Sequence, residues 1–142
     1  MPFVPKKLLL TYDDAGGLCH RVVPRMIQML EDRAFIVESR PLEDGALSVE
    51  DFDGIVLGTP VGLRARGASE RVLDWVGRAQ GIDERRVAVF SAFWIREAGA
   101  ASALRRRVEE TGAEVVVDVP YWLVRPDDGE QVLPAECMVR IR

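Results

Sequence analysis

The residues best suited to chemistry follow the first apolar run of the chain, between Tyr12 and His20 (YDDAGGLCH). The adjacent carboxylates of Asp13 and Asp14 offer the oxygen ligands that a divalent cation prefers. A small, turn-prone loop that leads into a helix offers the opposite chemistry, because the unpaired N–H groups of a helix start attract anions such as phosphate. The segment therefore predicts an ion site. The orientation of the two carboxylates decides whether that site favours a cation or an anion.

Electrostatic repulsion sets the scale of this conflict. Two unit charges about 5 Å apart in an effective dielectric near 20 repel by about 3 kcal/mol, so a carboxylate facing a doubly charged phosphate lowers its affinity by about two orders of magnitude or more. One hypothesis is that Asp14 itself occupies the anion site, held by the loop N–H groups and the helix N-terminus. The other is that Asp13 and Asp14 both face solvent and only initiate the helix. Arg64, Arg66 and Arg71 follow the third apolar run and are placed to meet a phosphate, an acidic partner, or these two aspartates.

Cys19 stands at the start of the predicted helix, where the helix dipole and Arg21 would lower the pKa of its thiol and make it a nucleophile. The alternative is a small buried thiol that fills the core. Cys19 and Cys137 lack metal-type spacing, and His20 is the only histidine, which excludes a zinc site of the cysteine and histidine type. Two neighbouring carboxylates alone are more often a solvated loop than a cation site, so we predict no metal.

Five short apolar runs predict strands, at 8–10, 35–37, 54–58, 87–90 and 115–117. Apolar residues at helical spacing predict three helices, one over 22–30, one capped by Ser69 and ended by Gly81, and one over 98–111. We expect the third strand to end at Thr59 and Pro60, since proline cannot donate to a central ladder. Trp75 is expected at a helix edge or an interface. The alternation predicts an α/β fold with a doubly wound parallel sheet.

The last part of the chain departs from this alternation. Extended segments at 121–124 and 139–141 flank Pro126-Asp127-Asp128-Gly129, which predicts a hairpin with an Asp-Gly turn in place of a closing helix. We therefore expect a single domain over 1–142, with a core over 7–117 and a C-terminal extension over 118–142. The missing helix leaves one face of the sheet for the extension or a partner subunit to cover, which predicts a homodimer.

Composition narrows the classes of partner. The net charge of -4 gives no general attraction for nucleic acid or an anionic membrane. No apolar run approaches the roughly 20 residues that span a bilayer, and the N-terminus lacks the apolar segment of a secretory signal. We expect a cytoplasmic protein.

Two segments resemble the flavodoxin family: Tyr12 to Val22 has the frame of its phosphate loop, and Asp51 to Val61 (DFDGIVLGTPV) is similar to its third-strand signature. The resemblance spans about residues 7–117 and implies a flavodoxin-like five-stranded sheet in the order 2-1-3-4-5. It also implies that FMN lies at the carboxyl ends of the strands, at the switch point between the first and third.

The residues that the resemblance places around FMN fall in three loops. It implies that the phosphate is surrounded by Asp13, Asp14, Ala15, Gly16, Gly17, Leu18 and Cys19. It implies that one side of the isoalloxazine is bordered by Thr59, Pro60, Val61 and Gly62, and the other side by Phe93 and Trp94. The positions where the family carries Ser and Thr hydroxyls read Asp14, Ala15, Gly16 and Cys19 here, while Gly17 is kept.

Two other classes fit the residues less well. A response-regulator receiver also carries an acidic pair after its first strand, but Gly58-Thr59 stands where its phospho-accepting aspartate belongs, and Val119-Pro120-Tyr121 stands where its lysine belongs. Ser91, expected just after the fourth strand, lacks the Gly-x-Ser-x-Gly elbow of a hydrolase. No catalytic acid, base or nucleophile is predicted.

Two functions therefore stay open. The first is an FMN-binding protein that passes electrons to a redox partner or acts as a flavin-dependent oxidoreductase. The second is a flavin-free scaffold or regulatory subunit that binds a protein partner through the same edge, including Phe93 and Trp94. Hydroxyls in the phosphate loop would favour the first function, whereas the aspartates favour the second.

Overall fold

A computed structural model of the chain describes residues 6–42, 48–61, 67–93 and 98–122. Its five strands are β1 (Lys7–Tyr12), β2 (Ile36–Pro41), β3 (Gly54–Val61), β4 (Arg86–Phe93) and β5 (Glu114–Trp122). They form one sheet in the order β2-β1-β3-β4-β5, and every neighbouring pair is parallel. The predicted α/β class and strand order are confirmed. The predicted hairpin and the homodimer surface depend on residues after 122, which lie outside the described ranges.

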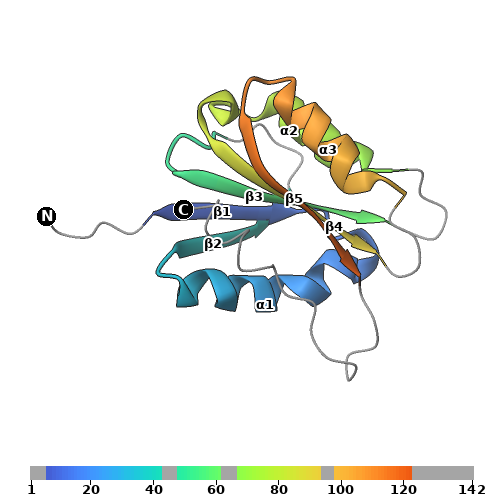
Figure 1. The fold of residues 1–142 in the computed structure, drawn as a ribbon, viewed down its shortest axis with the longest axis horizontal. Coiled ribbons are helices and arrows are strands. Elements are labelled where there is room, and N and C mark those ends of the chain that lie inside the picture. The colour runs from blue at the N-terminus through green and yellow to red at the C-terminus, as the bar shows by residue number, and fades with distance from the viewer. Residues whose placement is uncertain (1–5, 43–47, 62–66, 94–97, 123–142) are drawn as a thin grey trace, which may run out of the picture.

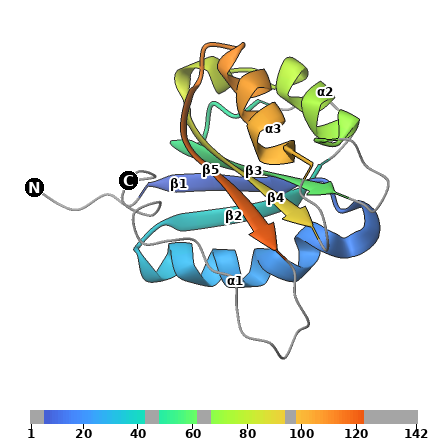
Figure 2. The same ribbon diagram turned by 45° about the vertical axis from the view of Figure 1, so that its right-hand side comes forward.

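Three α-helices cover the two faces of this sheet. They are α1 (Leu18–Asp32), α2 (Glu70–Arg78) and α3 (Ala100–Glu109), and short 3-10 turns, η1 (Ala15–Gly17) and η2 (Ile82–Glu84), precede α1 and β4. Helix α1 lies on one face, whereas α2 and α3 lie on the other (Figures 1 and 2). We call these the α1 face and the α2–α3 face. None of the helices in the described ranges is long and apolar enough to cross a membrane.

Alternation along each strand divides the core between the two faces. In β1, Leu8 and Leu10 pack on the α1 face with Met26 of α1. Leu9 packs on the opposite face with Trp75 of α2. Strands with both faces covered carry nearly continuous apolar runs, which is why the runs could be recognised in the sequence.

Trp75 belongs to this core, and its predicted place at a helix edge is wrong. Its side chain is only 2% exposed. Trp75 and Val76 follow Val72 by three and four residues, so all three lie on the same buried stripe of α2. The indole therefore extends the apolar face of the helix instead of leaving it.

Several element ends differ from those expected. Strand β3 continues through Pro60 to Val61. The Pro60 nitrogen, which has no hydrogen to donate, is directed towards the β1 side of the sheet. Strand β1 has already ended there, at its pair Tyr12–Gly58, so no ladder hydrogen bond is lost. Strands β4 and β5 run to Phe93 and Trp122, so the fifth strand takes in residues 118–122.

Helix α1 extends beyond the predicted 22–30 at both ends, whereas α2 and α3 are shorter than expected. Helix α2 ends at Arg78, with Ala79 already extended, and Gly81 instead begins η2 in a left-handed conformation. Helix α3 cannot begin at Ala98, because Ala98 and Gly99 both have positive φ angles, 57° and 69°. Pro24 lies inside α1, where it has no N–H to donate to the preceding turn.

Candidate functional site

The candidate site lies at the carboxyl edge of the sheet, where β1 and β3 lead to opposite faces. The chain passes from β1 into α1 on one face, whereas β3 is followed by α2 on the other. In open parallel sheets, this reversal leaves a crevice outside the strand ends where ligands bind. The residues that follow β1 and β3 therefore form the candidate site.

Asp13 is the charged residue that the structure buries at this edge, and its side chain is on the α2–α3 face. Its residue is only 2% exposed. Alternation places Asp13 on the same face as Leu9 and Thr11 and turns it away from α1. Burial of a carboxylate is tolerated only where hydrogen bonds or an opposite charge compensate it.

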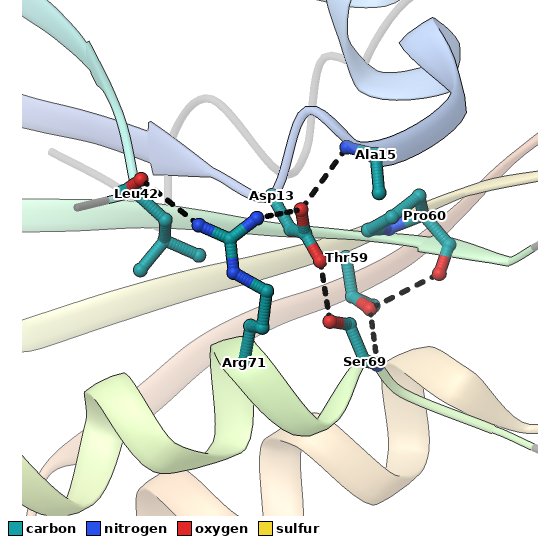
Figure 3. A network of polar contacts seen from close by, with 7 residues as sticks. All are labelled: Asp13, Ala15, Leu42, Thr59, Pro60, Ser69 and Arg71. Atoms are coloured by element: carbon teal, nitrogen blue, oxygen red, sulfur yellow. Dashed lines mark hydrogen bonds and ion pairs between the residues drawn. The ribbon is translucent and has the colours of Figure 1, made fainter. Parts of the chain in front are cut away.

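Three donors compensate the Asp13 carboxylate (Figure 3). The Ser69 hydroxyl donates to Oδ2 at 2.5 Å, and the Arg71 guanidinium donates to Oδ1 at 3.3 Å. The backbone N–H of Ala15 also donates to Oδ1, at 3.0 Å. Asp13 is thus joined both to α2 and to the loop that precedes α1.

Ser69 occupies the predicted N-cap position of α2, but its hydroxyl does not cap the helix. The hydroxyl instead donates to Asp13, and the Ser69 N–H donates to Oγ1 of Thr59 at 2.8 Å. The Thr59 hydroxyl donates in turn to the Pro60 carbonyl at 3.3 Å. This chain of bonds ties β1, β3 and the start of α2 together (Figure 3).

Arg71 extends the network to the end of β2. Its second guanidinium nitrogen donates to the Leu42 carbonyl at 3.5 Å, and the Leu42 N–H donates to the Tyr12 carbonyl at 2.8 Å. The Arg71 side chain is 54% exposed, in contrast to its partner Asp13. Of the partners open to Arg71 in the sequence, Asp13 is the one it meets, whereas Arg64 and Arg66 lie outside the described ranges.

Asp14 does not occupy the anion site, and it faces solvent, as the second hypothesis expected of it. It is exposed, and at the N-cap position of η1 it makes no side-chain hydrogen bond to the turn. The aspartate held by a loop N–H group is therefore Asp13 rather than Asp14. The view that both aspartates face solvent is wrong for Asp13, because the strand alternation carries its side chain inward.

No side chain caps the backbone N–H groups at the start of α1. Gly17 precedes the helix with a left-handed φ of 71°, and no side chain caps the helix there. A methyl group added at Gly17 would meet nothing within 4 Å. The first N–H groups of α1, from Leu18 onward, thus lack a capping side chain and point along the helix axis towards the edge.

Cys19 is buried in the core of the α1 face with Val22 and Val23. Burial raises the pKa of the Cys19 thiol far above its ordinary value, and the charges of Asp13 and Asp14 raise the pKa further. The thiol therefore stays protonated, and the hypothesis of a nucleophilic cysteine is wrong. The alternative, a small thiol that fills the core, is confirmed.

The other predicted segments reach the same edge of the sheet. Thr59, Pro60 and Val61 are buried at the end of β3, and Val61 pairs in register with the half-buried Phe93, the last residue of β4. Gly62 and Trp94 lie outside the described ranges. Ala15 is exposed, Leu18 is half-buried, and Gly16 lies in η1 between them.

Two serines near the site were not assigned to it from the sequence. Ser69 was expected only as a helix cap. Ser91 lies inside β4 instead of after it, directly beside Thr59 in register, and its buried hydroxyl has no hydrogen-bond partner in the structure as described. Ser91 belongs to a buried polar row with Thr11, Asp13 and Thr59 beneath the α2–α3 layer. A polar residue within an apolar strand is the signal that marks this row, whereas Ser69 is half-buried at the start of α2 and carries no such signal.

Within the described ranges, no group of three or more His, Cys, Asp or Glu side chains is placed to hold a metal ion. Both Asp13 oxygens are already used by protein donors. The two neighbouring carboxylates do not face each other across a shared site, because Asp13 is buried and Asp14 is exposed to solvent.

The topology and the position of this edge define a flavodoxin-like α/β protein. No protein-family model matches the chain, and no curated protein matches it. Among solved structures, it is similar to the two-electron reduced flavodoxin of Megasphaera elsdenii, at 20% identity and a TM-score of 0.68 over 94% of each chain. It is also similar to oxidised flavodoxin 2 from Bacillus cereus, at 21% identity and a TM-score of 0.68, covering 95% of this chain and 92% of that one. A Fusobacterium nucleatum flavodoxin variant bound to flavin mononucleotide matches at 16% identity and a TM-score of 0.59, covering 79% of this chain and 68% of that one. At these identities, the likeness shows the fold.

Proposed function

We propose that this protein binds FMN at the carboxyl edge of its sheet and carries electrons to and from a redox protein partner. The observation that supports this function best is the placement of Asp13. Its carboxylate points towards α2, and Arg71 compensates its charge. The carboxylate therefore does not occupy the start of α1, where the phosphate of a flavodoxin-like cofactor would bind.

The residues at the start of α1 fit a phosphate through their backbone. The helix of 15 residues begins without a capping side chain, and the backbone at Gly17 is open. Helix N-termini of this kind bind phosphate with N–H groups and the positive end of the helix dipole. Since Ala15, Gly17 and Leu18 have no hydroxyls, the phosphate would be held by backbone N–H groups rather than by side chains. The N–H groups of Ala15 and Gly17 already donate to Asp13 and to the Asp14 carbonyl, so those of Gly16, Leu18 and Cys19 would hold it.

The strand ends supply the surface for the ring system. Thr59, Pro60 and Val61 would border one side of the isoalloxazine, and Phe93 the other, where an aromatic contact contributes about 1 kcal/mol beyond buried area. Bound FMN would supply the electron-transfer chemistry. The protein residues would bind the phosphate, orient the ring and limit its contact with water.

A visible absorption spectrum of the freshly purified protein, followed by an FMN titration, tests this proposal. Flavin bands in the purified protein, or saturable quenching of flavin and tryptophan fluorescence at micromolar FMN, are the expected results. A colourless protein whose fluorescence does not respond to FMN up to millimolar concentration would overturn the proposal. Riboflavin, titrated in parallel, separates a failure of phosphate binding from a failure of ring binding.

One observation favours the flavin-free scaffold instead. The Ala15 N–H, a donor of the loop, is already used by Asp13, and the exposed carboxylate of Asp14 repels an incoming phosphate. If neither FMN nor riboflavin binds, the edge formed by the ends of β1, β3 and β4 is a surface for a protein partner.

A further inference from the structure

We infer that Arg71 is a positioning residue that sets the affinity of the proposed site for the phosphate group, acting through Asp13. This inference rests on the proposed function. It concerns the discrimination between a flavin with a phosphate and a flavin without one, which the ring contacts alone do not provide. Neither Arg71 nor Asp13 needs to touch the ligand for this effect.

The inference starts from the ion pair between Asp13 and Arg71. The carboxylate is almost fully buried, and the guanidinium nitrogen lies 3.3 Å from its Oδ1. The same arginine is anchored by the Leu42 carbonyl, so its position does not depend on Asp13 alone. In the protein as it stands, the pair has no net charge at the carboxyl edge.

A hydrogen bond then joins Asp13 to the loop in which the phosphate would bind. Asp13 immediately follows β1, and its Oδ1 accepts the N–H of Ala15, the first residue of the turn that leads to α1. A change in the charge of Asp13 and Arg71 therefore acts at the edge where the first N–H groups of α1 are open. The interior near a buried carboxylate screens charge less than bulk water does.

Loss of one member of the pair has opposite effects for the two members. Arg71→Gln removes a positive charge beside Asp13 and disfavours phosphate, whereas Asp13→Asn removes a negative charge from the same edge and favours phosphate. Riboflavin has no phosphate and responds to neither change through charge. The signature of the inference is therefore the ratio of the FMN and riboflavin dissociation constants.

The experiment measures this ratio by fluorescence titration in four variants and a matched control. We expect Arg71→Gln to weaken FMN binding about tenfold, equal to about 1.4 kcal/mol, with riboflavin binding unchanged within about twofold. Asp13→Asn is expected to strengthen FMN binding, and the double variant to return it to within about threefold of the starting value. Arg71→Lys should retain most of the affinity, and each effect should shrink as salt is raised.

Arg86→Gln is the matched control, because Arg86 forms an arginine–carboxylate pair with Glu114 at the opposite, amino edge of the sheet. It is expected to leave the ratio unchanged. An Arg71→Gln effect that is equal for FMN and riboflavin, or equal to that of Arg86→Gln, would overturn the inference while leaving the proposed function intact. Failure of both flavins to bind the unmodified protein would overturn the proposed function and the inference together.

A ligand-free measurement guards against variants that only unfold. Urea unfolding of Asp13→Asn, Arg71→Gln and the double variant forms a double-mutant cycle for the pair. Because either single change already removes the attraction between Asp13 and Arg71, we expect the double variant to be more stable than the sum of the single changes predicts. Strict additivity would show that the pair is not coupled, and would overturn the inference whatever the flavin titrations show.

Discussion

The ring of Phe90 lies against the α-carbon of Gly58, its direct partner in the register between β3 and β4. A methyl group at Gly58 would overlap the ring atoms. Phe90 is almost fully buried in the α1-face core and has no space to withdraw. The packing of the Phe90 ring over Gly58 therefore requires glycine at this position.

Gly58→Ala should be destabilising, because overpacking of this kind costs about 1–3 kcal/mol. Urea unfolding followed by circular dichroism measures the change. Gly77→Ala is the matched control, since the methyl group there would meet only the flexible guanidinium of Arg107. A helical Gly-to-Ala change is otherwise favourable by up to about 1 kcal/mol. Equal effects at the two glycines would contradict the packing argument.

Ala34→Gly should stabilise the protein. Ala34 follows the end of α1 with a positive φ of 68°, and the left-handed conformation costs a residue with a Cβ roughly 1 kcal/mol. We expect a gain of about 0.5–1 kcal/mol in the free energy of unfolding, less the entropy that glycine adds to the unfolded chain. The same substitution at Ala103, inside α3, should have the opposite sign, and a loss at both positions would contradict the prediction.

Cys19 should resist thiol reagents in the folded protein and weaken the fold at alkaline pH. Its pKa is raised by burial, so above about pH 8.5 the unfolded thiol loses its proton while the folded one keeps it. The free energy of unfolding then falls with rising pH, by up to about 1.4 kcal/mol per unit. Unfolding between pH 7 and 10 in a Cys137→Ala background measures this slope. Cys19→Ala should remove the contribution, and an unchanged slope would contradict it.

Ser91→Ala should leave the fold unharmed or stabilise it by about 1 kcal/mol, because it removes a buried hydroxyl without a partner in the structure as described. Thr59→Val is the contrasting variant. It removes the oxygen that accepts the Ser69 N–H, so we expect a loss of about 1–3 kcal/mol. Thermal and urea unfolding of the two variants provide the test, and a larger loss at Ser91 would show that its hydroxyl has a partner.

Asp14→Ser should raise the FMN affinity of the proposed site. The exposed carboxylate lies in the loop before α1, and its removal takes away repulsion that solvent screens only in part, a gain of about three- to tenfold. Asp32→Ser, a change of the same kind at the far end of α1, should have no effect. Equal FMN affinity for Asp14→Ser and the unmodified protein would contradict this prediction.

The spacing of apolar residues predicted the strands and helices, because burial against the core dictates that spacing. Burial on both faces favours nearly continuous apolar runs, so the runs in β1, β3, β4 and β5 were recognisable from short windows. The orientation of Asp13 was also within reach, since it continues the alternation of Leu9 and Thr11. Its partners were not, because Ser69 and Arg71 are 56 and 58 residues away in the chain and meet Asp13 only after β3 and α2 have packed. The end of β3 likewise depends on where its neighbour β1 stops.

Pro24 divides α1 into two parts with different stability. Without its N–H, the carbonyl of His20 loses its usual helical partner, so the segment Leu18–Val23 depends on the packing of its buried side chains to stay ordered. We expect the amides of this segment to exchange with solvent faster than those of Met26–Asp32. Because that same segment would hold a bound phosphate, occupancy of the site and the order of the first turns of α1 are linked equilibria. The first turns of the helix would then report the loading of the site by slower amide exchange, even where the sheet beneath them does not change.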